Sequence, residues 1–258
     1  MLTDYSHLTE ADGSRVTREQ LRRMYTRYAF AAELCEGKDV LEAACGIGQG
    51  LGLLGKKARC VAAGDYTQRL VDVAKVHYGD RFDIRQFDAQ LMPFANGSFD
   101  AVILYEAIYY LPGPRDFLAE CRRVLRPGGK VIVCTANKDW SGFSASPSSY
   151  EYFGVPELVC LLEGEGFSTE VFGDCPVVED SLRSRAISVV RSVAVKLRLM
   201  PDTLKAREKL KRIFFGKLLD MPAELEDGCA EYIRPVRLPN TSASRDYKVL
   251  FAVGLLKD

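Results

Sequence analysis

The chain has 258 residues, of which 47% are hydrophobic. A chain of this length and composition can bury one sizeable core, so we expect one α/β domain with added elements rather than two independent domains. Lysine plus arginine and aspartate plus glutamate number 35 each, which excludes the overall positive charge typical of nucleic-acid-binding proteins. We therefore expect no nucleic-acid partner.

The cysteines and histidines argue against a disulfide framework or a metal site. The eight cysteines form no C-x-x-C pair, and His7 and His77 are the only histidines. This pattern is typical of reduced core thiols in a cytoplasmic protein. The polar, acidic N-terminus does not resemble a signal peptide, and no apolar run approaches the roughly 18 residues of a membrane span. We expect a cytoplasmic protein without a transmembrane segment, and its oligomeric state stays open.

In chain order, apolar periodicity predicts an N-terminal helix and then alternating strands and helices. Residues 16–36 carry apolar side chains at helical spacing. From residue 38 onward, short apolar runs alternate with amphipathic stretches, which is typical of parallel strands joined by crossover helices. We expect strands at 40–44, 59–64, 82–87, 99–105, 130–135, 168–172 and 247–256. We expect helices opening at 46–55 and running over 68–78, where Thr67 can act as N-cap, 115–125 and 155–164.

This order predicts a seven-stranded, doubly wound α/β sheet. We expect an N-terminal helical cap at 1–37, a core at 38–174, a helical cap inserted at 175–246 and a final core strand at 247–258. The inserted segment is basic, because residues 180–217 hold 11 lysines and arginines against 3 acids. One interpretation is the solvated face of a docked helix; the other is contact with a membrane surface or an anionic acceptor.

A glycine-rich turn follows the first expected strand, in the run Glu42-Ala-Ala-Cys-Gly-Ile-Gly48. Glycines at such a turn let a ligand approach the backbone, and the helix that follows presents free N–H groups. Asp65 ends the next strand, where a carboxylate can accept hydrogen bonds from both ribose hydroxyls. Together these features predict a nucleoside-binding site, which a nicotinamide-dependent oxidoreductase would share.

Five motifs, in order, resemble those of class I S-adenosylmethionine-dependent methyltransferases, in particular the methyltransferase type 11-like bacterial group. They are VLEAACGIGQG at 40–50, GDYT at 64–67, FDA at 87–89, LMPF at 91–94 followed by SFD at 98–100, and LRPGG at 125–129. The resemblance implies a Rossmann-like fold and S-adenosylmethionine as cofactor, with S-adenosylhomocysteine as product. The chain departs from the family pattern at Ala44, at Phe87, and at Tyr109-Tyr110, where many relatives have a histidine pair.

The resemblance also implies roles for individual residues. Glu42 would orient the glycine turn or meet the methionine amino group, and Asp65 would bind the ribose. Tyr66 would pack against adenine, while Asp88 and the Ala89 N–H would bind its polar edge. The residues expected to bind the cofactor are Tyr28, Glu42, Ala44, Gly46, Gly48, Asp65, Tyr66, Asp88, Ala89 and Tyr105.

Methyl transfer from a sulfonium is an in-line displacement, for which a protein supplies mainly alignment and exclusion of water. A hydroxyl acceptor would also need a base, and the candidates are Tyr105, Glu106, Tyr109 and Tyr110. A tyrosine run of this kind can equally form a packing wall. The loop at 138–149, with Trp140, is either a substrate loop or a surface loop anchored to the core.

The expected function is methyl transfer to an O or N atom of a small metabolite, sugar-like or anionic. The alternative is a catalytically silent S-adenosylmethionine- or nucleoside-binding regulatory module. A nicotinamide-dependent oxidoreductase is disfavoured, because the acid at 88 and the LRPGG turn have no role in it.

Overall fold

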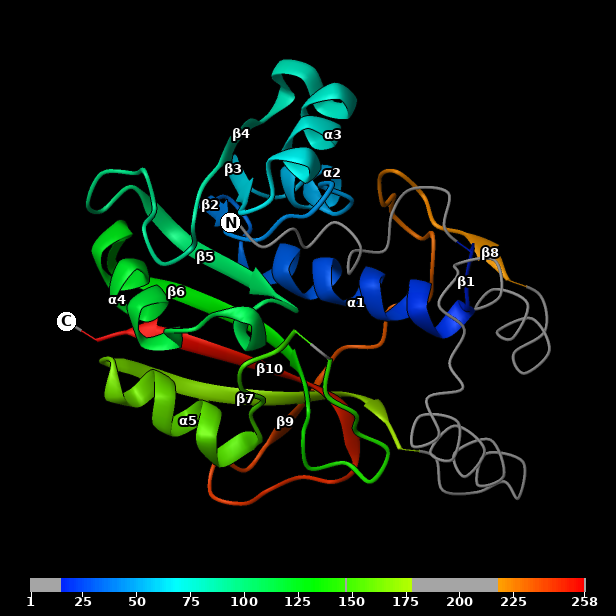
Figure 1. Ribbon diagram of the computed structural model, residues 1–258, viewed down its shortest axis with the longest axis vertical. Helices are drawn as coiled ribbons and strands as arrows, with labels where there is room; N and C mark the ends of the chain where they lie inside the picture. Colours follow the sequence, from blue (N-terminus) through cyan, green and yellow to red (C-terminus); the bar gives the residue numbers. More distant parts are fainter. Residues whose placement is uncertain (1–14, 147, 178–217, 258) are drawn as a thin grey trace.

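A computed structural model describes residues 15–146, 148–177 and 218–257. Its centre is a sheet of eight strands in the order β4-β3-β2-β5-β6-β10-β7-β9 (Figure 1). The strands are β2 Asp39–Glu42, β3 Cys60–Asp65, β4 Asp83–Gln86, β5 Phe99–Tyr105, β6 Leu125–Ala136, β7 Phe167–Pro176, β9 Val236–Leu238 and β10 Tyr247–Leu256. Strands β2 to β6 pair in parallel, whereas β10 is antiparallel to both β6 and β7. The expected doubly wound α/β class is confirmed.

Helices cover both faces of this sheet. The helices are α1 Arg18–Leu34, α2 Leu51–Gly55, α3 Gln68–Tyr78, α4 Pro114–Val124 and α5 Val155–Gly164, with 3-10 turns η1 Gly79–Arg81 and η2 Ile108–Tyr110. Side chains of α1, α2 and α3 pack in one hydrophobic cluster, and those of α4 and α5 pack in the other. In Figure 1 the two groups accordingly lie on opposite sides of the sheet.

The strand sequences explain why both faces are covered. Along β5, Ala101, Ile103 and Tyr105 belong to one cluster, while Val102 and Leu104 belong to the other. Successive side chains of a strand point to opposite faces, so a continuous apolar run requires packing on both sides. The order of the parallel strands reverses between β2 and β5, and this switch point is where ligands of such sheets bind.

Helix α1 is fixed at its start by a capping box. The Thr17 hydroxyl accepts from the Gln20 N–H at 3.1 Å, and the Gln20 side chain accepts from the Thr17 N–H at 3.0 Å. The helix buries Leu21, Met24 and Tyr28 at helical spacing, toward the glycine turn after β2. This packing sets α1 over the carboxyl ends of the parallel strands.

The sheet has eight strands rather than the expected seven. The additional strand, β9, pairs antiparallel with β7 and covers the edge that β7 would otherwise expose. A second small sheet joins β1 Arg15–Val16 to β8 Leu219–Asp220. Both β8 and β9 lie in the segment expected to be a helical cap, and each is too short to show a period in the sequence.

The described part of that segment, 218–246, contains these strands and irregular backbone, without a helix. The basic stretch at 180–217, on which the idea of a membrane or anion contact rested, lies outside the described residues.

Two smaller expectations change. Thr67 does occupy the N-cap position of α3, but its side chain makes no capping hydrogen bond to the helix. Strand β6 begins at Leu125, so the LRPGG turn is an irregular start of the strand, and the pairing with β5 shifts register there. Within the part of the chain that the structure describes, no helix combines the length and the apolar character needed to cross a bilayer.

Candidate active site

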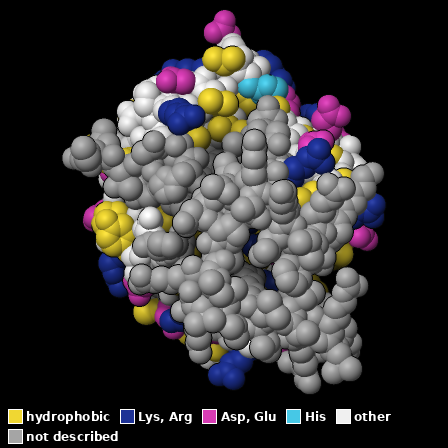
Figure 2. Space-filling view, turned by 45° about the vertical axis from the view of Figure 1, so that its right-hand side comes forward, with side chains coloured by type: hydrophobic (Ala, Val, Ile, Leu, Met, Phe, Trp, Pro, Cys, Tyr) yellow, Lys and Arg dark blue, Asp and Glu magenta, His cyan; other side chains and the backbone are white. Residues whose placement is uncertain are grey.

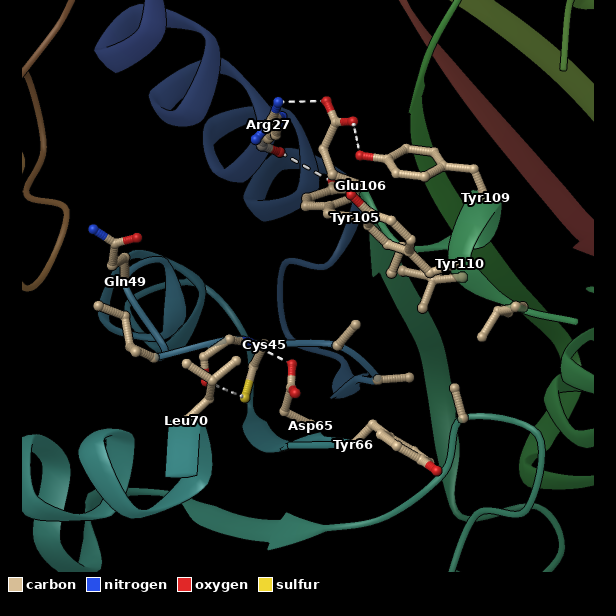
Figure 3. Close-up of a pocket in the computed structure, with 18 of the residues that line it drawn as sticks. Arg27, Cys45, Gln49, Asp65, Tyr66, Leu70, Tyr105, Glu106, Tyr109 and Tyr110 are labelled. Carbon is tan, nitrogen blue, oxygen red and sulfur yellow. Dashed lines mark hydrogen bonds and ion pairs between the residues drawn. The ribbon is translucent and has the colours of Figure 1, made fainter. Parts of the chain in front are cut away.

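A pocket of about 480 Å³ opens at the carboxyl ends of β2, β3 and β5, beneath α1. Its walls come from the glycine turn, the ends of β3 and β5, the segment after β4, and one face of α1 (Figure 3). The lining residues fall into two groups, one around Asp65 and Asp88 and the other around Glu106 and Tyr109. The pocket therefore has two chemically different ends.

The first end is built from the glycine turn. Gly46 and Gly48 have φ values of 58° and 82°, in the left-handed region that favours glycine. A Cβ at Gly48 would also lie 2.9 Å from the Tyr78 ring. Ala44 and Gly46 line the pocket as expected, but Gly48 does not; its carbonyl instead accepts from the Tyr78 hydroxyl at 2.7 Å.

Asp65 forms the floor of this end. One carboxylate oxygen accepts from the Gly46 N–H at 3.0 Å, and the other accepts from the Thr67 N–H at 2.9 Å. Burial raises the pKa of Asp65, while these backbone hydrogen bonds oppose the rise. The two bonds orient the carboxylate at the edge of the pocket, where it can accept further hydrogen bonds from a diol.

Three further expected residues meet Asp65 around the same cavity. Tyr66 follows it at the end of β3, and its side chain lines the pocket (Figure 3). Asp88 and Ala89 line the opposite wall, and the Gln90 N–H donates to Asp88 at 2.9 Å. The structure thus brings Asp65, Asp88 and Ala89 together around one cavity.

Glu42 lies behind the pocket wall rather than in its lining. Its side chain is fully buried, and its Oε1 accepts from the Tyr28 hydroxyl at 2.7 Å. Among the described residues, its Oε2 has no hydrogen-bond partner. Burial raises the pKa of Glu42 to about 8. Tyr28 and Cys45 do line the pocket, and both interact with this carboxyl group.

These residues fit S-adenosylmethionine. Its sulfonium and ammonium groups are cationic, and an unsatisfied buried carboxyl oxygen beside the cavity favours a cation. Asp65 and Asp88 would hold the adenosine half, and the turn from Ala44 to Gly46 would meet the methionine half. When bound, this cofactor would supply an electrophilic methyl group.

The second end is centred on Glu106, which directly follows β5 and has a φ of 51°. Its Oε1 accepts from the Arg27 guanidinium at 2.5 Å, and a second guanidinium, that of Arg23, lies at 3.7 Å. Its Oε2 accepts from the Tyr109 hydroxyl at 2.9 Å (Figure 3). The left-handed backbone turns this carboxylate toward α1, and two cations stabilise its charge.

The three candidate tyrosines differ in their surroundings. The Tyr105 hydroxyl donates to the Arg27 carbonyl at 3.0 Å, and burial raises the pKa of Tyr105. Burial and the charge of Glu106 likewise raise the pKa of Tyr109, so its phenol stays protonated at neutral pH. The Tyr110 hydroxyl donates to the Ser146 hydroxyl at 3.0 Å. All three line the pocket, which agrees with their expected location but leaves their roles to experiment.

The loop after β6 borders this end. Tyr152 stacks on Tyr109 with ring centroids 4.4 Å apart, and Phe143 packs edge-on against Tyr152 at 4.7 Å. Tyr150 lines the pocket and is 66% exposed, so it stands at the mouth. The segment after β6 therefore supports the aromatic wall of the pocket.

Sequence reasoning missed the polar face of α1. Gln20, Arg23 and Arg27 all line the pocket, together with Met24 and Tyr28. Their spacing of three or four residues places them on one side of a helix, which was the available signal. Polar residues that share one side of a helix with buried apolar residues indicate a surface that faces a ligand. The sequence alone does not show which cavity that surface borders.

The fold and the two-ended pocket are typical of a class I S-adenosylmethionine-dependent methyltransferase domain. Comparison with known families agrees, because residues 41–133 match the model of the methyltransferase domain family. The resemblance inferred from the five motifs is confirmed, and with it S-adenosylmethionine as the cofactor of this domain.

Relatives with curated descriptions are named as methyltransferases. A probable S-adenosylmethionine-dependent methyltransferase of Mycolicibacterium smegmatis is 36% identical over 153 residues, covering 58% of this chain and 59% of the relative. A ubiquinone biosynthesis O-methyltransferase of Xanthomonas oryzae is 31% identical over 147 residues, covering 55% of this chain and 62% of the relative. The chain therefore spans less than two thirds of the length of these relatives.

Solved structures support the fold over nearly the whole chain. The YcgJ protein of Bacillus subtilis has a TM-score of 0.58 at 17% identity, covering 93% of this chain and 99% of that one. The [4+2]-cyclase SpnF has a TM-score of 0.59 at 17% identity, covering 96% and 85%. Because a cyclase shares the fold, the fold alone does not define the reaction.

Proposed function

We propose that this chain transfers the methyl group of S-adenosylmethionine to an oxygen or nitrogen atom of a small acceptor. The observation that carries the proposal is the single pocket that joins the Asp65 and Asp88 end to the Glu106 and Tyr109 end. Cofactor and acceptor would meet in one enclosed space, with Tyr105 between the two ends. In-line displacement requires this shared alignment.

The residues of the first end would bind and orient the cofactor. Asp65 is held by the Gly46 and Thr67 N–H groups at 3.0 and 2.9 Å, so its orientation is set before the ligand arrives. Tyr28 closes the pocket from above, and only 7% of its surface is exposed. Pre-orientation lowers the entropic cost of binding, and closure keeps water from competing with the acceptor.

The residues of the second end would orient the acceptor. Glu106 would take the proton of a hydroxyl acceptor, because its Oε2 accepts from the Tyr109 hydroxyl at 2.9 Å, a donor that an acceptor hydroxyl can replace. Tyr109 would act as a donor and as an aromatic wall, because its raised pKa keeps the phenol protonated. Arg27 and Arg23 would hold the carboxylate in place.

The second end favours a small polar acceptor, sugar-like or anionic. Two guanidinium groups face one carboxylate there, and tyrosine hydroxyls supply further donors. The names of relatives point to small molecules too, since they include a demethylmenaquinone methyltransferase and a ubiquinone biosynthesis O-methyltransferase. On the part of the described surface that is visible in Figure 2, acidic and basic side chains are interspersed.

The proposal is tested by measuring S-adenosylhomocysteine formation with acceptor panels. The protein would be incubated with S-adenosylmethionine and matched sets of sugars, sugar acids, phenols and primary amines, and the product quantified by mass spectrometry. We expect at least one set to raise product formation above the acceptor-free blank, and Glu106→Gln to reduce that rate. Binding of S-adenosylmethionine without turnover on any set would favour the alternative, a silent cofactor-binding module.

A further inference from the structure

Glu42 occupies an unusual position for a carboxyl group. It ends β2, its side chain is fully buried, and Tyr28 donates to its Oε1 at 2.7 Å. Its Oε2 has no hydrogen-bond partner among the described residues. An ionised carboxylate with one neutral donor and no cation is strongly disfavoured away from water.

The titratable groups that face Glu42 supply no compensating charge. They are Tyr28 of α1, Cys45 of the glycine turn, Asp65 of β3, Tyr78 of α3 and Tyr105 of β5. All are phenols, a thiol or a second carboxyl group, and no ion pair to Glu42 is found in the described part of the chain. Burial, opposed by the Tyr28 hydrogen bond and reinforced by Asp65, raises the pKa of Glu42 to about 8.

The pocket lies one side chain away from this group. Tyr28 and Cys45 touch the cavity on one side and interact electrostatically with Glu42 on the other. A positive charge in the cavity beside these two residues would therefore act on Glu42 across buried side chains. Electrostatic interactions are strong in such a low-dielectric environment. An opposite charge at such range favours the ionised form of a carboxyl group.

We propose that binding of a cationic ligand in this pocket expels a proton from Glu42, with Tyr28 as the positioning residue that holds the ionised carboxylate. The O–H bond at Oε2 breaks, the proton passes to the solvent, and the electron pair stays on the carboxylate. This inference rests on the proposed function, because S-adenosylmethionine is the cation concerned. Cofactor binding is then linked to proton release, and its affinity rises with pH toward 8.

The linkage depends on the charge of the ligand. S-adenosylmethionine brings a sulfonium and an ammonium group, S-adenosylhomocysteine brings only the ammonium group, and adenosine brings neither. We expect proton release to decrease in that order. A ligand that fills the same space without charge should leave Glu42 protonated.

The test is calorimetric titration at pH 6.5 in two buffers of different ionisation enthalpy, which counts the protons released on binding. At this pH an α-amino group stays largely charged, because its ordinary pKa is about 7.7–8.0. Wild type and Glu42→Gln are compared, since glutamine keeps the shape of the side chain but does not titrate. We expect S-adenosylmethionine to release about 0.5–1 proton more from wild type than from the variant, and adenosine to show no difference.

Each outcome separates the two proposals. If S-adenosylmethionine binds wild type and Glu42→Gln with the same proton count, the proton linkage is wrong although the cofactor assignment stands. If neither S-adenosylmethionine nor adenosine binds wild type, the proposed function fails and the linkage with it.

Tyr28→Phe gives a second variant, in case the glutamine variant does not fold. Phenylalanine keeps the ring that packs on Gly50 but removes the hydrogen bond that lowers the pKa of Glu42. The midpoint of the pH profile of proton release should move to higher pH, and at pH 6.5 the affinity for S-adenosylmethionine should fall more than that for adenosine. Equal weakening of both ligands with an unmoved midpoint would mean that Tyr28 is only structural.

A ligand-free readout is also available. The folded pKa of Glu42 is raised above its ordinary value of 4.5, so its contribution to stability is full below that value and is lost as pH rises toward 8. The Tm of wild type relative to Glu42→Gln should therefore fall between pH 5 and pH 8. A constant difference across this range would show that Glu42 does not hold a proton in the free protein.

Discussion

The two ends of the pocket are built in different ways. At the cofactor end, Asp65 is held by backbone N–H groups of Gly46 and Thr67, and every contributor comes from a short motif at the end of a strand. At the acceptor end, Glu106 is held by the nearby Tyr109 and by side chains of α1, which come from a distant part of the chain. The first end depends on backbone geometry, whereas the second depends on side-chain pairing that evolution can change without altering the fold.

The largest expected effect is the loss of cofactor affinity when Asp65 is replaced. Asp65→Ala removes charged hydrogen bonds to a ribose, each worth about 1.5–3 kcal/mol, so affinity for S-adenosylhomocysteine should fall about 100- to 1,000-fold. Asp83→Asn is the matched control, because Asp83 is an exposed acid at the opposite end of the neighbouring strand β4 and does not line the pocket. Equal affinities for wild type and Asp65→Ala in calorimetry would remove Asp65 from the site.

The next effect concerns the acceptor end alone. Glu106→Gln should lower kcat by about 100-fold for a hydroxyl acceptor, the lower limit for loss of a general base, with cofactor affinity unchanged. Tyr109→Phe should cost less, because it removes only a donor to Glu106 and keeps the ring that stacks on Tyr152. Steady-state kinetics would check both variants. Full turnover in both would exclude base catalysis by this cluster and leave a packing wall.

A third variant tests how α1 joins the two ends. A Cβ added at Gly50 would overlap the Tyr28 ring, so Gly50→Ala should destabilise the fold by about 1–3 kcal/mol, as overpacking typically does. Gly164→Ala is the control, since an added Cβ there is 3.4 Å from Arg115 and lies in the last turn of α5. Chemical denaturation would compare them. A Gly50→Ala protein as stable as wild type would contradict the close packing of α1 on the glycine turn.

The smallest effect lies at the amino end of strand β2, away from both ends of the pocket. Arg59 and Arg126 hydrogen-bond to Asp39, which lowers the pKa of that carboxyl group. Its stabilising contribution is present above the ordinary value of 3.8 and is lost as pH falls below it. Acid unfolding monitored by circular dichroism should therefore start at slightly higher pH in wild type than in Asp39→Asn, relative to their stabilities at pH 7. If the two proteins unfold over the same acidic pH range, these ion pairs contribute nothing measurable to the free energy of unfolding.

This contrast explains what the sequence could predict. Strands β2 to β5, α3 and α5 were predicted to within two residues at each end, because continuous apolar runs and a 3.6-residue period are strong local signals. The cofactor end was equally accessible, since the glycine turn and Asp65 follow consecutive strands that must lie side by side. Strand β9 was missed because three residues carry no period.

The acceptor end was only partly accessible to sequence analysis. Glu106 and the tyrosines could be named because they lie at or just after the end of a predicted strand, but the pairing of Glu106 with Arg23 and Arg27 joins segments about 80 residues apart. Glu42 illustrates the same limit at shorter range. Its motif predicted a contact with the cofactor, whereas its burial and its bond to Tyr28 depend on how α1 docks.

The central claim is that this pocket is a site for S-adenosylmethionine rather than for a dinucleotide. The most direct measurement is calorimetric titration of S-adenosylmethionine, S-adenosylhomocysteine and NADH into the wild-type protein. We predict saturable one-to-one binding of the first two and no binding of NADH, because Asp88, which lines the pocket, has no role in a dinucleotide site. Binding of NADH, with no heat from the two sulfur compounds, would contradict the account.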